Sequence, residues 1–339
     1  MITDVVPPEE LIYSSDSEPG WRRIRRGDHF AYLDAAGKAL KAMDRQRIEA
    51  LVIPPAWTEV WICPDPDGHL QATGRDERGR KQYLYDPRWT QHRSETKFGS
   101  LLSFARVLPS IREQVEADLR RRRTDLPHVA ASVVWLLDNS LIRIGNSRYA
   151  KENKSFGLTT LRNRHVEIAG KAVRFRFKGK SGKQWKLELT DRRIARIVSN
   201  LQDLPGQHLF QYEDEEGVHP ITSRDVNAYI SERAGGTFSS KHFRTWSATV
   251  GAYDLLSQME RAETKTGRAR QVNEVLDTIC QRLGNTRAVC RSGYVHPRVI
   301  ADWEEGRLIR PKGVRTKPFL DRDELETLAY LKGIEANDQ

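Results

Sequence analysis

The sequence has few residues of the kinds that build disulfide frameworks or metal clusters. Its 339 residues include three cysteines, an odd number at loose spacing, and nine scattered histidines that form no HExxH motif. A disulfide framework, a thiolate cluster and a metal site are therefore not expected. No apolar run approaches the ~18 residues of a membrane helix. Residues 1–20 are acidic and have no hydrophobic signal core, so we expect a cytoplasmic protein.

What the chain has in excess is positive charge. Its net charge is +10, its pI is about 9.5 and its mean hydropathy is −0.65. A basic protein of this size often binds a polyanion, so nucleic acid is favoured as a partner. At 339 residues the chain is too long for most single cores, and two domains are expected.

The first part of the chain predicts a small, mainly β domain, residues 1–90. Short alternating runs there are broken by Pro-Pro, Pro-Asp and Gly turns, and one helix is expected around residues 41–53. The polar, aperiodic segment 86–97 is the expected linker.

Residues 91–339 predict a larger, mainly α domain, so the fold class is α+β. Helical spacing begins at about Phe98 and recurs in a stripe from Val133 to Ile144, with Gly145 as the expected C-cap. Residues 173–177 and 185–189 alternate like a β-hairpin. Further helices are expected at 190–201, 223–234, 241–257 and 268–283, with a last short helix at 321–334.

Five side chains that could carry chemistry lie at element boundaries. They are Arg143, Lys180, Arg244, Asn285 and Tyr294. Taken singly, each is ordinary: an arginine near a helix end is usually a solvated or capping residue, and a tyrosine after Ser-Gly usually packs half-buried.

Taken with their surroundings, these residues resemble a known family. The segments GRDERGRKQYLY (74–85), IRIGNSRYAKENKSFGLTTLRNRHV (142–166), KGKSGK (178–183), KHFRTW (241–246) and GNTRAVCRSGYVHP (284–297) are similar to the small type IB DNA topoisomerases of bacteria and poxviruses. The resemblance covers nearly the whole chain. It implies a catalytic domain related to that of the tyrosine recombinases, with a three-stranded sheet beside its helices.

The resemblance also implies a mechanism. Tyr294 would attack a phosphodiester and form a 3′-phosphotyrosyl link, while Arg143 and Arg244 would clamp the non-bridging oxygens. Lys180 would be the general acid for the 5′-oxygen, and Lys241 matches a second lysine of the family. Strand rotation and religation would then relax supercoils.

Asn285 departs from the family pattern, which often has histidine at this position, nine residues before the tyrosine. An amide can donate the same hydrogen bond but cannot carry charge. The scheme needs no metal and no ATP, because the cations do the electrostatic work and the phosphotyrosine conserves the bond energy. No cofactor is expected.

Double-stranded DNA is the partner that the resemblance implies, with a monomer clamping the duplex near the nucleoid. In the family, the N-terminal domain forms a cap over the DNA. Residues of this domain, together with Tyr149 of the second domain, are expected to contact DNA: Arg75, Arg80, Lys81, Gln82, Tyr83, Tyr85 and Tyr149. Packing within a strand is an equally good reading of Tyr83 and Tyr85. For the run from Arg120 to Arg123, a solvated helix face is the favoured reading over phosphate contact.

Three other functions compete with this one. A site-specific tyrosine recombinase would share the tyrosine and both arginines, but would usually have histidine where this chain has Lys241 and a helical N-terminal domain. A non-catalytic DNA-binding protein would predict a broken residue set. A magnesium-dependent nuclease would need paired carboxylates, which the sequence does not suggest.

Overall fold

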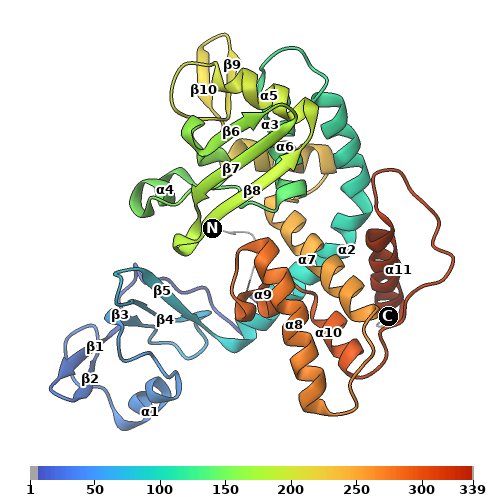
Figure 1. Ribbon diagram of the computed structural model, residues 1–339. Coiled ribbons are helices and arrows are strands. Elements are labelled where there is room, and N and C mark those ends of the chain that lie inside the picture. Colours follow the sequence, from blue (N-terminus) through green and yellow to red (C-terminus); the bar gives the residue numbers. More distant parts are fainter. Residues whose placement is uncertain (1–6, 338–339) are drawn as a thin grey trace. The chain divides into compact units, whose positions relative to one another are not determined.

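The computed structural model describes residues 7–337, so the first six residues of the acidic N-terminal segment lie outside it. The chain divides into two compact units, an N-terminal unit, Met1–Gly99, and a C-terminal unit, Ser100–Gln339 (Figure 1). The boundary expected from the sequence was at residue 90, and the limits of the functional domains stay a prediction.

The N-terminal unit contains a five-stranded antiparallel sheet in the order β2-β1-β3-β4-β5. The strands are β1 (Trp21–Arg26), β2 (His29–Leu33), β3 (Thr58–Ile62), β4 (Leu70–Arg75) and β5 (Lys81–Tyr85), and the helix α1 spans Ala42–Ala50. Ile48 of α1 packs with Val60, Ile62 and Ala72 of the sheet in one apolar cluster. The predicted small β unit with a helix near residues 41–53 is confirmed.

The expected linker at residues 86–97 is helical from residue 87 onward, because these residues begin the long helix α2 (Pro87–Asp118), and helical structure thus starts well before the expected Phe98. The Asp86 carboxylate accepts the Arg88 amide at 2.8 Å, and its carbonyl accepts the Thr90 amide at 3.0 Å. This is the hydrogen bonding of a helix N-terminus. Trp89 alone is deeply buried in the first turn, so the segment has no apolar stripe that the sequence could reveal.

Helices dominate the C-terminal unit, and the expected ones are present. The main helices are α3 (Leu126–Ser140), α5 (Arg192–Gln202), α6 (Ser223–Ala234), α7 (Ser240–Ser257), α8 (Lys265–Leu283) and α11 (Arg322–Asn337). A core cluster joins the buried faces of α7 and α8 with the shorter α9 (Arg287–Gly293) and α10 (Pro297–Glu304), which the sequence did not predict. Helix α7 contacts α8, α10 and α11 (Figure 1).

The end of α3 corrects the expected C-cap. The helix stops at Ser140, and Leu141 takes the left-handed conformation at φ 55° while its amide donates to Leu137 O. A non-glycine residue there costs free energy, which made Gly145 the better candidate by sequence. The residues between Leu141 and Asn146 are non-helical and carry Arg143.

The second sheet is the predicted three-stranded one, in the antiparallel order β6-β7-β8. Its strands are β6 (Val166–Ala169), β7 (Ala172–Lys178) and β8 (Gln184–Thr190). A two-stranded hairpin of β9 (Gln211–Asp214) and β10 (Gly217–Pro220) was not predicted. The remaining short elements are α4 (Ser147–Asn153) and three 3-10 turns, η1 (Leu158–Thr160), η2 (Asn163–His165) and η3 (Lys180–Gly182). Kinship of this unit with tyrosine recombinases stays a prediction.

Candidate active site

Arg244 is a buried arginine near the start of α7. It is the fifth residue of the helix, one position beyond the first turn in which the sequence put it, and only 3% of it is exposed. Its guanidinium donates to the Leu141 carbonyl and, at 2.8 Å, to the Leu283 carbonyl. Leu141 is the C-cap of α3, and Leu283 is the last residue of α8. Burial lowers the pKa of Arg244, but an arginine remains charged at any physiological pH.

Arg143 and Asn285 form a second pair in the same place. Arg143 donates to the Asn285 side-chain oxygen, and also to the Gly284 carbonyl at 3.5 Å. Asn285 follows the C-cap of α8. Its main-chain N–H donates to the Cys280 carbonyl at 3.3 Å. The side-chain oxygen of Asn285 thus accepts from Arg143, and the NH₂ group is the remaining hydrogen-bonding end of this side chain.

Two buried donors of this group have no acceptor of standard geometry among the described residues: Arg244 Nε and Asn285 Nδ2. Buried N–H groups in folded proteins are nearly always paired, because an unpaired one costs about 1–3 kcal/mol. Arg244 and Asn285 both interact with the Tyr294 phenol through their side chains, so these donors belong to the surroundings of that phenol.

The main chain of Arg143 is fixed by a close approach of two glycines. The Arg143 carbonyl accepts the Leu158 amide at 2.9 Å. A Cβ atom on Gly157 would lie 2.5 Å from that carbonyl and 2.6 Å from the Gly145 nitrogen. Gly145 itself has φ +95°, a conformation that side chains rarely adopt. Both glycines are thus needed for the path that brings Arg143 to Asn285.

Tyr294 completes the group at the end of α9. Its amide donates to the Cys290 carbonyl at 3.0 Å, and the Arg244 guanidinium lies 5.2 Å from the centre of its ring. Burial raises the pKa of the Tyr294 phenol, but the charge and hydrogen bond of Arg244 outweigh this, with help from Arg143 and Asn285. The pKa is lowered overall, which favours the phenolate, the nucleophilic form.

The two lysines are both solvent-exposed. Lys180 is exposed in the turn between β7 and β8, where Ser181 and Gly182 both have positive φ. Its ammonium makes no hydrogen bond or ion pair with any described residue. Lys241 is exposed in the first turn of α7, and its carbonyl accepts the Thr245 hydroxyl at 3.1 Å. The structure thus brings together Arg143, Arg244, Asn285 and Tyr294, and leaves both lysines at the surface.

In the N-terminal unit, the three basic side chains predicted to bind phosphates are each held by a carboxylate. The ion pairs are Arg75–Glu59 at 2.7 Å, Arg80–Asp76 at 2.7 Å and Lys81–Asp16. The sequence did not reveal these pairs, because two of them join residues far apart in the chain. Each pair is solvent-accessible, so it holds the cation in place without removing it from water.

Three of the four uncharged residues predicted to contact DNA, Gln82, Tyr83 and Tyr85, lie on β5. Gln82 donates to the Asp76 carboxylate at 2.9 Å, and the Tyr83 and Tyr85 rings stack with centroids 6.1 Å apart. Tyr83 is 49% exposed, so packing within the strand explains its position only in part. Tyr149 lies in the C-terminal unit, half-buried in α4, where its amide donates to Asn146 Oδ1 at 3.0 Å.

Comparisons with known proteins agree with this geometry. Residues 86–307 match the family described as eukaryotic DNA topoisomerase I, catalytic core, and residues 29–76 match the bacterial DNA topoisomerase IB, N-terminal domain. A DNA topoisomerase 1B of Acanthamoeba polyphaga mimivirus is 32% identical over 285 residues, which cover 81% of this chain and 85% of that protein. The chain belongs to the type IB DNA topoisomerases.

Other relatives match over shorter stretches. The DNA topoisomerase 1B of vaccinia virus (strain Copenhagen) is 30% identical over 107 residues, 32% of this chain and 34% of that protein. A DNA topoisomerase 1 of Mycosarcoma maydis is 27% identical over 178 residues, 46% of this chain and 17% of that protein. The chain is therefore a type IB topoisomerase enzyme, and its substrate is DNA.

The charge of the topoisomerase is unevenly divided between its two units. Residues 1–99 hold 15 lysines and arginines against 16 aspartates and glutamates, so the whole excess of +10 belongs to residues 100–339. Within residues 7–337, no group of His, Cys, Asp and Glu side chains is arranged to hold a metal ion, and no helix is both long and apolar enough to cross a membrane.

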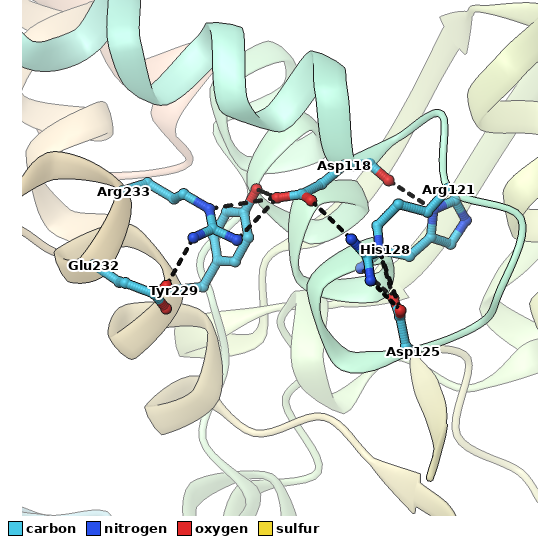
Figure 2. Close-up of polar contacts among 7 residues, drawn as sticks. All are labelled: Asp118, Arg121, Asp125, His128, Tyr229, Glu232 and Arg233. Atoms are coloured by element: carbon cyan, nitrogen blue, oxygen red, sulfur yellow. Dashed lines mark hydrogen bonds and ion pairs between the residues drawn. The ribbon is translucent and has the colours of Figure 1, made fainter.

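The basic run of Arg120, Arg121, Arg122 and Arg123 lies in the turn after α2, which corrects the expected helix face. Arg121 belongs to a polar network that joins the ends of α2, α3 and α6 (Figure 2). At its centre, Asp118 accepts the Tyr229 hydroxyl at 2.8 Å and Arg233 at 3.2 Å. Asp125 pairs with Arg121 at 2.6 Å. This network fixes the helix ends in the C-terminal unit.

Proposed function

We propose that Tyr294 is the nucleophile of this topoisomerase. Its oxygen would attack the phosphorus of one DNA strand, forming a 3′-phosphotyrosyl bond as the bond to the 5′-oxygen breaks. The observation that carries the proposal is the Arg244 guanidinium 5.2 Å from the ring centre of the half-buried Tyr294, a charge that also lowers the pKa of the phenol. Rotation of the released 5′ end, followed by attack of the 5′-hydroxyl on the phosphotyrosine, would relax supercoils and restore the tyrosine.

Arg143, Arg244 and Asn285 would stabilise the transition state. Phosphoryl transfer through a pentacovalent arrangement concentrates negative charge on the non-bridging oxygens, which charged and preorganised donors stabilise best. Arg244 Nε and Asn285 Nδ2 support this role, because both are buried donors whose side chains interact with the phenol. Asn285 would act as a neutral donor where many relatives of the family use histidine.

Lys180 would be the general acid that protonates the leaving 5′-oxygen, with Lys241 as the alternative. Proton donation of this kind contributes roughly 10²–10⁴ in rate. The exposure of Lys180 at the tip of a turn with two positive-φ residues is compatible with a side chain that reaches the leaving group only when DNA is bound.

For DNA binding, we propose that Arg75, Arg80 and Lys81 contact phosphates from a domain comprising residues 1–90. We also propose that Gln82, Tyr83, Tyr85 and Tyr149 contact the duplex. The long-range electrostatic attraction would come from the C-terminal unit, since it carries the whole charge excess. All four clustered active-site residues belong to one unit of one chain, so we propose that a monomer, associated with the nucleoid, is sufficient.

The decisive experiment is relaxation of positively and negatively supercoiled plasmid in EDTA without ATP, followed by denaturation to trap covalent adducts. Tyr294→Phe should abolish both relaxation and the adduct and leave DNA binding unchanged, since it removes only one oxygen. Tyr212→Phe, in the β9 strand, is the matched control and should behave as wild type. A covalent adduct in Tyr294→Phe, or a strict need for magnesium, would overturn the proposal.

A further inference from the structure

The main chain of Tyr294 is held from two sides. On one side its amide donates to the Cys290 carbonyl of α9 at 3.0 Å. On the other, its carbonyl accepts the hydroxyl of Thr249 on α7 at 3.2 Å, and the same hydroxyl oxygen accepts the His296 amide at 3.1 Å. One side chain of α7 thus brackets the turn that begins at Tyr294.

Thr249 differs from Thr245 and Thr327, two other buried threonines of the α-helices. Its side chain is fully buried. The Thr245 hydroxyl, on the same helix, bonds back to the Lys241 carbonyl, and Thr327 of α11 bonds back to Asp323 in the same manner. That bond within the helix is the common use of such a hydroxyl. The Thr249 hydroxyl instead donates one hydrogen bond and accepts another, both with a segment 45–47 residues further along the chain.

The two hydrogen bonds of Thr249 are important for the position of Tyr294, because Tyr294 lies outside regular secondary structure. It is the C-cap of α9, with φ −137° and ψ −31°, so no helical hydrogen bonding fixes its carbonyl. The helix that carries Thr249 also carries Arg244, whose guanidinium lies over the Tyr294 ring. A hydrogen bond from α7 to the Tyr294 carbonyl therefore sets the distance between the phenol and the arginine on that same helix.

We propose that Thr249 is a positioning residue of the reaction, whose hydroxyl holds the main chain of Tyr294 so that the phenol stays beside Arg244. The proposal rests on the role of Tyr294 given above. Thr249 touches neither the phenol nor the DNA in this scheme, and it acts through the tyrosine. Its removal leaves the Tyr294 carbonyl and the His296 amide without this partner, and the turn moves to satisfy them.

Two consequences distinguish positioning from simple packing. Displacement of a reacting group by about 1 Å can cost about 10²-fold in rate, so cleavage slows. In addition, a phenol that has moved away from Arg244 loses the cation that lowers its pKa. The pH at which the cleavage rate rises, as the phenol ionises, then moves upward. A variant that only destabilised the fold would lower the melting temperature without changing the pH at which the cleavage rate rises.

The test compares Thr249→Val, which keeps the shape and removes the hydroxyl, with Thr249→Ser, which keeps the hydroxyl. Thr327→Val is the matched control, another fully buried helical threonine. Single-turnover cleavage of a short duplex is measured from pH 5 to pH 10, with DNA affinity and melting temperature alongside. We expect the cleavage rate of Thr249→Val to fall by about 10–100-fold. We also expect the pH at which its rate rises to move upward. Thr249→Ser and Thr327→Val should keep the wild-type profile.

A folded Thr249→Val whose pH profile matches wild type overturns the proposal, whether or not its rate falls. If Thr249→Val does not fold, Thr249→Ala against Thr249→Ser decides in the same way. Tyr294→Phe is assayed in parallel to separate the two levels of inference. If that variant still forms the covalent adduct, the assignment of the nucleophile has failed. If it forms none and Thr249→Val is normal, only the positioning role has failed.

Discussion

Replacing Asn285 by aspartate would separate the two tasks of this side chain. An aspartate has nearly the same shape and can still accept the Arg143 hydrogen bond, but it has no N–H group in place of Nδ2 and cannot donate. Loss of one preorganised donor to a transition-state oxygen costs about 10²–10³ in rate, or about 2.7–4 kcal/mol. A carboxylate about 4 Å from the reacting phosphate adds up to about 4 kcal/mol of repulsion at an effective dielectric of about 20, which the Arg143 pair offsets in part.

We therefore expect Asn285→Asp to slow single-turnover cleavage by about 10³-fold or more. Arg143 would keep the pKa of the new carboxyl below its ordinary value, so the defect should not recover between pH 6 and pH 8. Asn139→Asp, an exposed asparagine of α3 that donates to Trp135 O, is the control and should cleave normally. An Asn285→Asp enzyme within about tenfold of wild type, or about 1.4 kcal/mol, would refute the role of the amide as a donor.

Three further predictions concern the acid, DNA binding and stability. Lys180→Ala should slow cleavage by about 10²–10⁴-fold, and a substrate with sulfur in place of the bridging 5′-oxygen should restore much of the rate. Replacement of the exposed Lys171 by alanine is the control and should not change the rate. Equal slowing of Lys180→Ala on the oxygen and the sulfur substrate would exclude Lys180 as the dominant acid. Log affinity for duplex DNA should fall against log salt with a slope of about −5 if about six phosphates are neutralised, and a flat titration would contradict this. Tyr229→Phe removes the 2.8 Å hydrogen bond to Asp118 and should cost about 1.5 kcal/mol, or about 3–6 °C in Tm by calorimetry, whereas Tyr212→Phe should cost nothing measurable.

The regular elements of the C-terminal unit could be predicted because their signals are local. An apolar stripe marks α8 from Val272 to Leu283, and alternation marks the β7–β8 hairpin. The polar start of α2 has no such stripe, and the end of α3 depends on a left-handed Leu141 that propensity disfavours. Both errors arise where tertiary contacts override a local preference.

The candidate site divides in the same way. Arg143, Arg244 and Tyr294 were named from motifs, and the structure brings them together. The role of Thr249 could not be read from the sequence, because a threonine in the middle of an amphipathic helix is typical of packing. Its partners lie 45–47 residues further along the chain, at a turn whose geometry no short motif encodes. The carboxylate partners of Arg75 and Lys81 were missed for the same reason.

The meeting of Gly145 and Gly157 limits how this enzyme can vary. At most positions in a protein, a larger side chain can be accommodated by a neighbour that changes its rotamer. At Gly157 a side chain would collide with main-chain atoms, namely the Arg143 carbonyl and the Gly145 backbone. No substitution can make these main-chain atoms smaller. No second substitution can compensate for a first one there. In a saturation library selected for activity, position 157 should therefore accept glycine alone, while Gly333 in α11, whose Cβ direction is open, should accept alanine freely.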